Sequence, residues 1–145
     1  MPFGVGTSSN LNAPGQSNAA NQINPTVEIL GGHDPSHPYF DGSAFANPPN
    51  GILGSTGRNI LRGPGLFSIN QSINRTFAFK EDKIKFQLVG EAFNLTNTVV
   101  FANPGGSCCW VTNPTTGAVN YNGFAVIGNT VSSPRYFQVG GYLRF

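Results

Sequence analysis

Apolar and polar residues alternate along three segments in the second half of the chain. In residues 66–79, apolar side chains mostly occupy odd-numbered positions, and Ser, Asn and Thr occupy even-numbered ones. Segments 83–101 and 135–145 alternate in the same way. Because successive side chains of a strand point to opposite faces, this period of two predicts three β-strands. The polar residues Lys80–Asp82 fit a short hairpin connection, which would pair the first two strands antiparallel.

The last predicted strand ends on an aromatic residue, Phe145. Chain ends of soluble proteins usually fray and carry polar side chains. A strand needs roughly 9–11 residues to cross a membrane, and segment 135–145 has this length. The pattern predicts an all-β, antiparallel fold: the last strands of a transmembrane β-barrel, preceded by a long irregular loop region. An ordinary soluble β-sandwich strand with one buried face is the alternative interpretation.

The two faces of the predicted strands separate side chains that would meet lipid from those that would meet the lumen. Gln71 and Arg75 are polar exceptions on the apolar face of the first strand. The side chains expected to face lipid are Phe67, Ile69, Ile73, Ile84, Phe86, Leu88, Phe137 and Val139. Those expected to face the lumen on the last strand are Gln138, Gly140, Tyr142 and Arg144.

Composition divides the chain into two regions. Residues 1–64 are rich in Gly, Pro, Asn and Ser, which predicts a loop-rich region of extracellular type. Residues 65–145 hold the three strands and a long loop over 102–134. We interpret the apolar run Phe124–Ile127 as an extension inside this loop, because a fourth crossing would move the C-terminus to the other side of the membrane. With short turns in the periplasm and long loops outside, the C-terminus is expected in the periplasm.

Charge and composition narrow the classes of partner. Only 10% of the residues are charged, against roughly 25% in typical soluble domains. The formal net charge is +2 and the basic residues are scattered, which argues against nucleic acid as a partner. The segment after Met1 has neither the basic nor the apolar part of a secretory signal. Either the membrane interpretation is wrong, or the chain is the downstream part of a longer exported protein whose signal lies elsewhere; we expect the second.

Candidate chemical groups are few. His33, Asp34 and His37 are suitable ligand types for zinc. They lie on a Gly- and Pro-containing loop that has no helical face to align them, and no further strong ligand is nearby, so a solvated loop is the preferred interpretation. Hydrolase, metalloprotease and phosphate-loop motifs are absent from the sequence. We expect no enzymatic activity and no cofactor.

The adjacent residues Cys108 and Cys109 are the only cysteines. Neighbouring residues reach disulfide geometry only with strain. In an oxidising compartment they would pair with cysteines elsewhere in a longer chain, or they are two loop thiols beside Trp110.

Several sequence blocks carry a resemblance to a known family. The tail Gln138–Phe145 resembles the barrel-assembly signal of outer-membrane proteins. Gly57–Gly65, followed by a strand and then by Glu91–Asn97, resembles the last strands of TonB-dependent outer-membrane transporters, most closely the Oar-like group, many of which carry a carboxypeptidase-regulatory-like domain. Pro38–Asp41 and Ser43–Phe45 resemble the final loop region of that group. The similarity covers most of the chain.

The resemblance implies a segment of an energy-coupled importer in the bacterial outer membrane. Outer-membrane lipid, the barrel-assembly machinery, and the plug and remaining strands of a longer chain would be its partners, and TonB would act only through regions that this sequence lacks. Three strands are far fewer than the roughly 22 of such a barrel. The positions that match the assembly signal are Gln138, Gly140, Leu143 and Phe145. The alternative function is a β-rich structural or adhesive subunit that self-associates through exposed strand edges.

Overall fold

The computed structural model of the chain describes residues 1–80 and 83–145 and has an all-β architecture. It contains two compact units. The loop unit combines Met1–Gly65 with Phe101–Thr130, and the sheet unit combines Leu66–Val100 with Val131–Phe145. The boundary expected near residue 64 falls at the end of the first segment. Most of the predicted 102–134 loop, however, belongs to the same compact unit as the N-terminal region.

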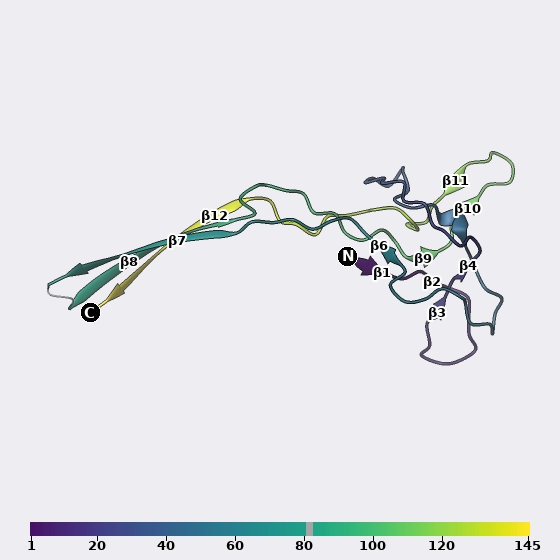
Figure 1. The fold of residues 1–145 in the computed structure, drawn as a ribbon, viewed down its shortest axis with the longest axis horizontal. Coiled ribbons are helices and arrows are strands. Elements are labelled where there is room, and N and C mark those ends of the chain that lie inside the picture. Colours follow the sequence, from purple (N-terminus) through teal and green to yellow (C-terminus); the bar gives the residue numbers. More distant parts are fainter. Residues whose placement is uncertain (81–82) are drawn as a thin grey trace. The chain divides into compact units, whose positions relative to one another are not determined.

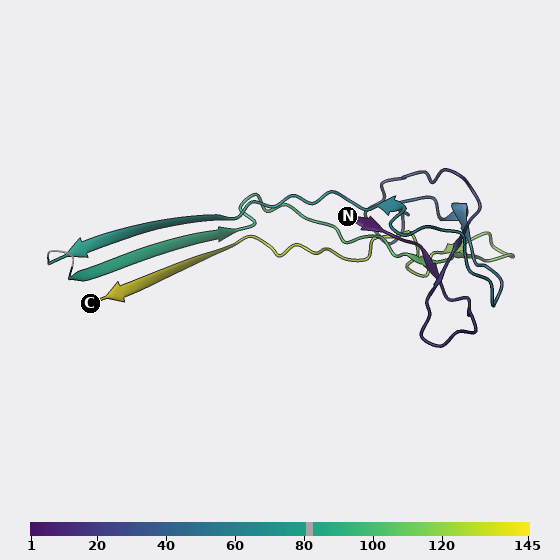
Figure 2. The same cartoon turned by 60° about the horizontal axis from the view of Figure 1, so that its bottom comes forward.

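The sheet unit contains one three-stranded antiparallel sheet. Its strands are β7 (Gln71–Phe79), β8 (Ile84–Phe93) and β12 (Tyr136–Arg144), with β8 in the centre. Figure 2 shows the three strands side by side, whereas they overlap in the view of Figure 1. Phe79 pairs with Ile84 at the end of the first ladder, so residues 80–83 connect β7 to β8. Glu81 and Asp82 of the expected turn lie outside the described residues.

All three strands are shorter than the alternating segments predict. β8 ends at Phe93 because Asn94 has a φ of 48°, in the left-handed region where the strand cannot continue. In the β7–β8 register, Gln71 pairs with Ala92. The residues before Gln71 therefore run past the end of their partner strand, and β7 starts five residues later than the predicted segment 66–79. β12 begins one residue later and ends one residue earlier than the predicted segment 135–145.

The loop unit contains only two-residue strands and one short 3-10 turn, η1 (Gly42–Ala44). Its strand pairs bring distant segments of the chain together: β1 with β6, β2 with both β3 and β9, β4 with β5, and β10 with β11. The strand bounds are β1 Pro2–Phe3, β2 Gly6–Thr7, β3 Asn18–Ala19, β4 Asn21–Gln22, β5 Phe45–Ala46, β6 Leu61–Arg62, β9 Ser107–Cys108, β10 Val111–Thr112 and β11 Val119–Asn120.

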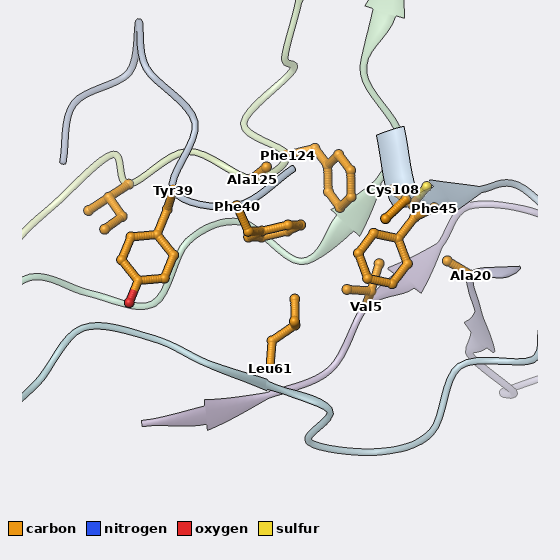
Figure 3. Packing of buried hydrophobic residues seen from close by; sticks show 11 residues of the cluster. Val5, Ala20, Tyr39, Phe40, Phe45, Leu61, Cys108, Phe124 and Ala125 are labelled. Carbon is orange, nitrogen blue, oxygen red and sulfur yellow. The ribbon is translucent and has the colours of Figure 1, made fainter. Parts of the chain in front are cut away.

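A core of aromatic and aliphatic side chains holds these short strands together. Phe40, Phe45 and Phe124 contact one another edge to face, with ring centroids 5.4–6.2 Å apart, which is a favoured aromatic geometry. Figure 3 shows the three rings with Leu61 and Val5 beside them. Phe40 and Phe124 are fully buried. Irregular backbone therefore surrounds a packed interior.

The apolar run Phe124–Ile127 forms part of this interior. All four residues are buried, and the run forms no named strand: Phe124 makes a single bridge to Gly105. The run lies in the core of the loop unit, and its interpretation as an extension inside the 102–134 loop stays a prediction. Gly105 has no room for a side chain, because a Cβ atom would collide with the carbonyl of Gly123.

Candidate functional site

Most of the large apolar side chains of β7, β8 and β12 lie on one face of the sheet. Each row across this face takes one residue from each strand, and Phe79 with Ile84 closes the hairpin end. From the hairpin end outward, the three-residue rows are Phe77–Phe86–Leu143, Arg75–Leu88–Gly141, Ile73–Gly90–Val139 and Gln71–Ala92–Phe137. Six of the eight residues predicted to face lipid lie within these strands, all on this face; Phe67 and Ile69 precede β7.

The opposite face of the sheet is mainly polar. Its three-residue rows are Ala78–Lys85–Arg144, Thr76–Gln87–Tyr142, Asn74–Val89–Gly140 and Ser72–Glu91–Gln138. At the end away from the hairpin the same face carries the stacked pair Phe93–Tyr136, with ring centroids 4.6 Å apart. The four residues predicted to face the lumen on the last strand all lie here. The sheet is therefore amphipathic in register across all three strands.

Large apolar side chains on the apolar face are exposed within the chain. The exposed fractions are 69% for Ile73, 67% for Phe137 and 75% for Val139. In water, burial of such side chains would contribute about 1.5–3 kcal/mol each, and the sheet unit supplies no second layer to bury them. A sheet of this kind is suited to a membrane, where lipid covers the apolar face.

The four positions that resemble the assembly signal divide between the two faces of β12. Gln138 and Gly140 lie on the polar face, and Leu143 lies on the apolar face opposite Phe86. Phe145 follows the strand and is 98% exposed. These side chains make no common cluster, and their role in assembly stays a prediction.

A polar junction at the far end of the sheet was not anticipated from the sequence. The Asn94 side chain donates to the carbonyl oxygens of Thr98 (3.1 Å) and Ser133 (2.9 Å), and its backbone N–H donates to Asn70 Oδ1 at 2.9 Å. Asn97 Oδ1 accepts from the backbone N–H of Arg135 at 3.1 Å. Asn94 and Asn97 both have positive φ. We call this set the Asn94 junction.

The Asn94 junction connects the segments that lead into β7 and β12 to the end of β8. Asn94 is only 8% exposed, and its side-chain bonds satisfy its buried amide. It lies in the Glu91–Asn97 block that carried the family resemblance. One signal in the sequence could have indicated the junction. Asn tolerates left-handed backbone, and Asn94 lies where the strand alternation fades.

The three candidate zinc ligands are not brought together as a metal site. His37 Nδ1 lies 2.9 Å from Asp34 Oδ2, whereas the His33 ring packs against Phe101 at 4.7 Å and Tyr39 at 6.1 Å. Among residues 1–80 and 83–145, no group of three or more His, Cys, Asp or Glu side chains could hold a metal ion. The hydrogen bond from His37 lowers the pKa of Asp34 below its ordinary value, with a further bond from the Ser36 backbone.

Cys108 and Cys109 are joined in a disulfide, which differs from both states expected from the sequence. In the fold, Cys108 belongs to β9 and is buried in the core, and Cys109 packs against the same cluster. Both side chains are therefore held within one interior, where a distant cysteine is not needed as a partner.

An amphipathic antiparallel sheet with both faces open and no core of its own defines the class of membrane β-strand proteins. The family model for an outer membrane beta barrel domain matches residues 1–138. The chain belongs to this family. No curated protein and no solved structure matches the chain. Among the described residues, no helix has both the length and the apolar character to span a membrane.

Proposed function

We propose that this chain is the C-terminal barrel segment of a TonB-dependent outer-membrane transporter. The observation that carries the proposal is the shared register of β7, β8 and β12, which places one mainly apolar face and one mainly polar face across the sheet. In this role the apolar face meets outer-membrane lipid and the polar face borders the lumen and plug. The tail and the Glu91–Asn97 block support the transporter assignment through their resemblance to that family.

The sheet also requires neighbours at both edges. β7 and β12 each pair only with β8 among the described strands, so each has one edge with unpaired backbone groups. In hydrocarbon an unpaired backbone group costs several kcal/mol, so a closed barrel must supply further strands from the same longer protein. The segment would then contribute strands, an extracellular loop region and an assembly signal to energy-coupled solute uptake, without enzymatic activity.

The topology follows from the strand directions. β7 and β12 run in the same direction, antiparallel to β8, and Figure 2 shows the chain end at the hairpin end of the sheet. If short turns face the periplasm, the ends of the β7–β8 ladder at Phe79 and Ile84 lie on that side, together with Phe145. The barrel-assembly machinery would meet the last strand on this side.

Substitution of the terminal aromatic residue in the full-length protein tests whether the tail acts as a barrel-assembly signal. Phe145→Ala is expected to lower the yield of heat-modifiable barrel in outer-membrane fractions, because the assembly signal loses its terminal aromatic residue. Tyr142→Ala is the matched control: it removes an aromatic ring from the same strand at a position outside the signal. Equal barrel yield for Phe145→Ala and the unaltered protein would refute the role of the tail.

A β-rich adhesive subunit is the second candidate, favoured by the two open edges of the sheet, which can template pairing with other chains. The two functions differ in assembly state. A transporter segment gives a discrete barrel that depends on the rest of its chain, whereas an adhesive subunit expressed alone gives ordered polymers. Size-exclusion chromatography with electron microscopy of the isolated chain distinguishes them: disordered aggregate supports the transporter, and regular fibres support the adhesive subunit.

A further inference from the structure

Arg75 interrupts the apolar face of the sheet. It shares a row with Leu88 and Gly141 on that face, two rows from the hairpin end. Its guanidinium carbon lies 6.0 Å from the centre of the Phe77 ring. Because Phe77 is nearer the hairpin, the Arg75 side chain leans toward the hairpin end of the sheet. A long basic side chain that starts within an apolar band extends in this way to bring its charge to the membrane surface.

The charge of Arg75 lacks an anionic partner within the described part of the chain. No ion pair or hydrogen bond of its guanidinium is present there, and Glu91 lies on the opposite face of the sheet. Arg135 provides a contrast. Its guanidinium also lies near a ring, that of Phe137 at 5.8 Å, but Arg135 Nη1 donates to the Leu95 carbonyl at 3.4 Å. Arg135 is thus tied to Leu95, beside the Asn94 junction, whereas among residues 1–80 and 83–145 the Arg75 guanidinium has only the aromatic contact.

An apolar groove begins in the row next to Arg75, on the side away from the hairpin. It has a volume of about 310 Å³. Gly90 and Ala92 of β8 form its floor, and Ile73 stands on one side with Phe137 and Val139 on the other. A Cβ atom on Gly90 would meet nothing closer than the Ile73 carbonyl oxygen at 3.9 Å. The small residues of the floor therefore leave open space above the central strand.

We propose that the apolar face binds one anionic phospholipid of the leaflet at the hairpin end, with its phosphate on Arg75 and one acyl chain in the groove above Gly90. The relative positions of the Arg75 guanidinium and the groove fit this ligand. A phospholipid places its charged head at the membrane surface and its chains toward the midplane, and here the guanidinium leans toward the hairpin while the groove runs the other way. The fork of donors on Arg matches phosphate oxygens. Charge complementarity selects an anionic head, because a zwitterionic head carries a cation that the guanidinium repels. The inference rests on the proposed membrane-spanning role, with the hairpin in the periplasm.

The test uses the full-length barrel, purified in detergent and first shown to be heat-modifiable. Native mass spectrometry then measures retained phosphatidylglycerol after addition of equal amounts of phosphatidylglycerol and phosphatidylcholine. Arg75→Gln is expected to lower phosphatidylglycerol retention about fivefold, which is typical for one basic residue at an anionic membrane surface. Arg75→Lys should restore most of the retention. Arg144→Gln removes a charge from the polar face and serves as the matched control.

A second variant tests the groove without changing charge. Gly90→Leu fills the space above β8, and there is no backbone clash at the Cβ position to prevent folding. It should lower the retention of both lipids while the barrel remains heat-modifiable. Ala78→Leu adds similar bulk on the polar face and should leave retention unchanged.

The outcomes separate this inference from the proposed function. Equal phosphatidylglycerol retention by the unaltered protein and Arg75→Gln, in barrels that are properly assembled, overturns lipid binding and leaves the barrel assignment intact. Equal loss in Arg75→Gln and Arg144→Gln also overturns it, because the effect would then reflect total charge. A full-length protein that never forms a barrel overturns both. If a protein subunit is found on the apolar face and no lipid is retained, lipid binding is overturned and the partner of this face is a protein.

Discussion

The loop unit and the sheet unit use their apolar side chains in opposite ways. The loop unit has strands of two residues, yet it buries Phe40, Phe45 and Phe124 in a common interior. The sheet unit has strands of nine and ten residues, yet its apolar side chains, such as Val139, are exposed. Regular hydrogen bonding and a hydrophobic core therefore occur in different parts of this chain.

This difference shows which surroundings each unit requires. A packed core supplies its own apolar environment, so irregular backbone is stable around it in water. An amphipathic sheet of three strands has no such interior and depends on lipid for one face and on further strands for its edges. Long paired strands satisfy the backbone hydrogen bonds of the sheet unit. Whether the apolar side chains are buried or exposed indicates whether a unit is suited to water or to lipid.

The largest expected effect is loss of the loop-unit core. Phe40→Ala leaves a cavity among rings that touch one another, and should destabilise the loop unit by about 3–5 kcal/mol. Ile52→Ala, at a half-exposed position of the same unit, should change stability by less than about 0.5 kcal/mol. Hydrogen exchange followed by mass spectrometry on the full-length protein measures both. Unchanged protection of the loop unit in Phe40→Ala would mean that its core does not stabilise it.

A charge on either face of β7 tests whether the sheet really distinguishes lipid from lumen. Ile73→Arg places a cation on the apolar face and should cost about 2–4 kcal/mol near the midplane of the membrane. Asn74→Arg, one residue along on the polar face, should cost little. The yield of heat-modifiable barrel reports the difference. Equal yields would contradict the assignment of the faces.

The Asn94 junction should make a smaller contribution. Asn94→Ala removes the side-chain bonds to Thr98 and Ser133 and leaves their carbonyls without this donor, a loss of about 1–3 kcal/mol. Asn94→Gly loses the same bonds but accepts positive φ more readily, so it should be less destabilising than Asn94→Ala. Denaturant unfolding of the full-length barrel in detergent compares them. If both variants matched the unaltered protein, the junction would be dispensable.

The smallest expected effect is the contribution of Asp34 to stability at low pH. The folded-state pKa of Asp34 is lowered from 3.8, first by the His37 hydrogen bond and then by the Ser36 backbone. A carboxyl with a depressed pKa contributes stability above its unfolded value, and this contribution is lost as pH falls below 3.8 through the folded pKa. His37→Ala should raise the pKa of Asp34 toward 3.8, as NMR titration of the carboxyl would detect. A pKa unchanged by the substitution would show that His37 does not hold it down.

Parts of the fold followed from the sequence because they depend on local periodicity. Ile73, Phe86 and Val139 lie on one face because strand side chains alternate, and the alternation is visible in the sequence. The ends of the strands were not predictable in this way. The left-handed backbone at Asn94 ends β8 and, through the register, sets the start of β7.

The loop unit shows the converse. Its composition correctly indicated irregular backbone, but Phe40 and Phe124 lie far apart in the sequence, with no periodic pattern to connect them. Their contact, and the joining of residues 101–130 to the N-terminal segment, depend on long-range packing. The disulfide between Cys108 and Cys109 was missed for a different reason: it joins adjacent residues, a pairing that the expected geometric strain had argued against.

The sequence by itself determined that this protein is all-β and that its long strands carry one apolar and one polar face, because a period of two is a local property of extended backbone. Only the tertiary structure decided the rows across those strands, the Asn94 junction and the core of the loop unit, because each depends on which distant residues become neighbours. Arg75 needed both: its position on the apolar face is read from the alternation, whereas the groove beside it exists only when three strands are paired.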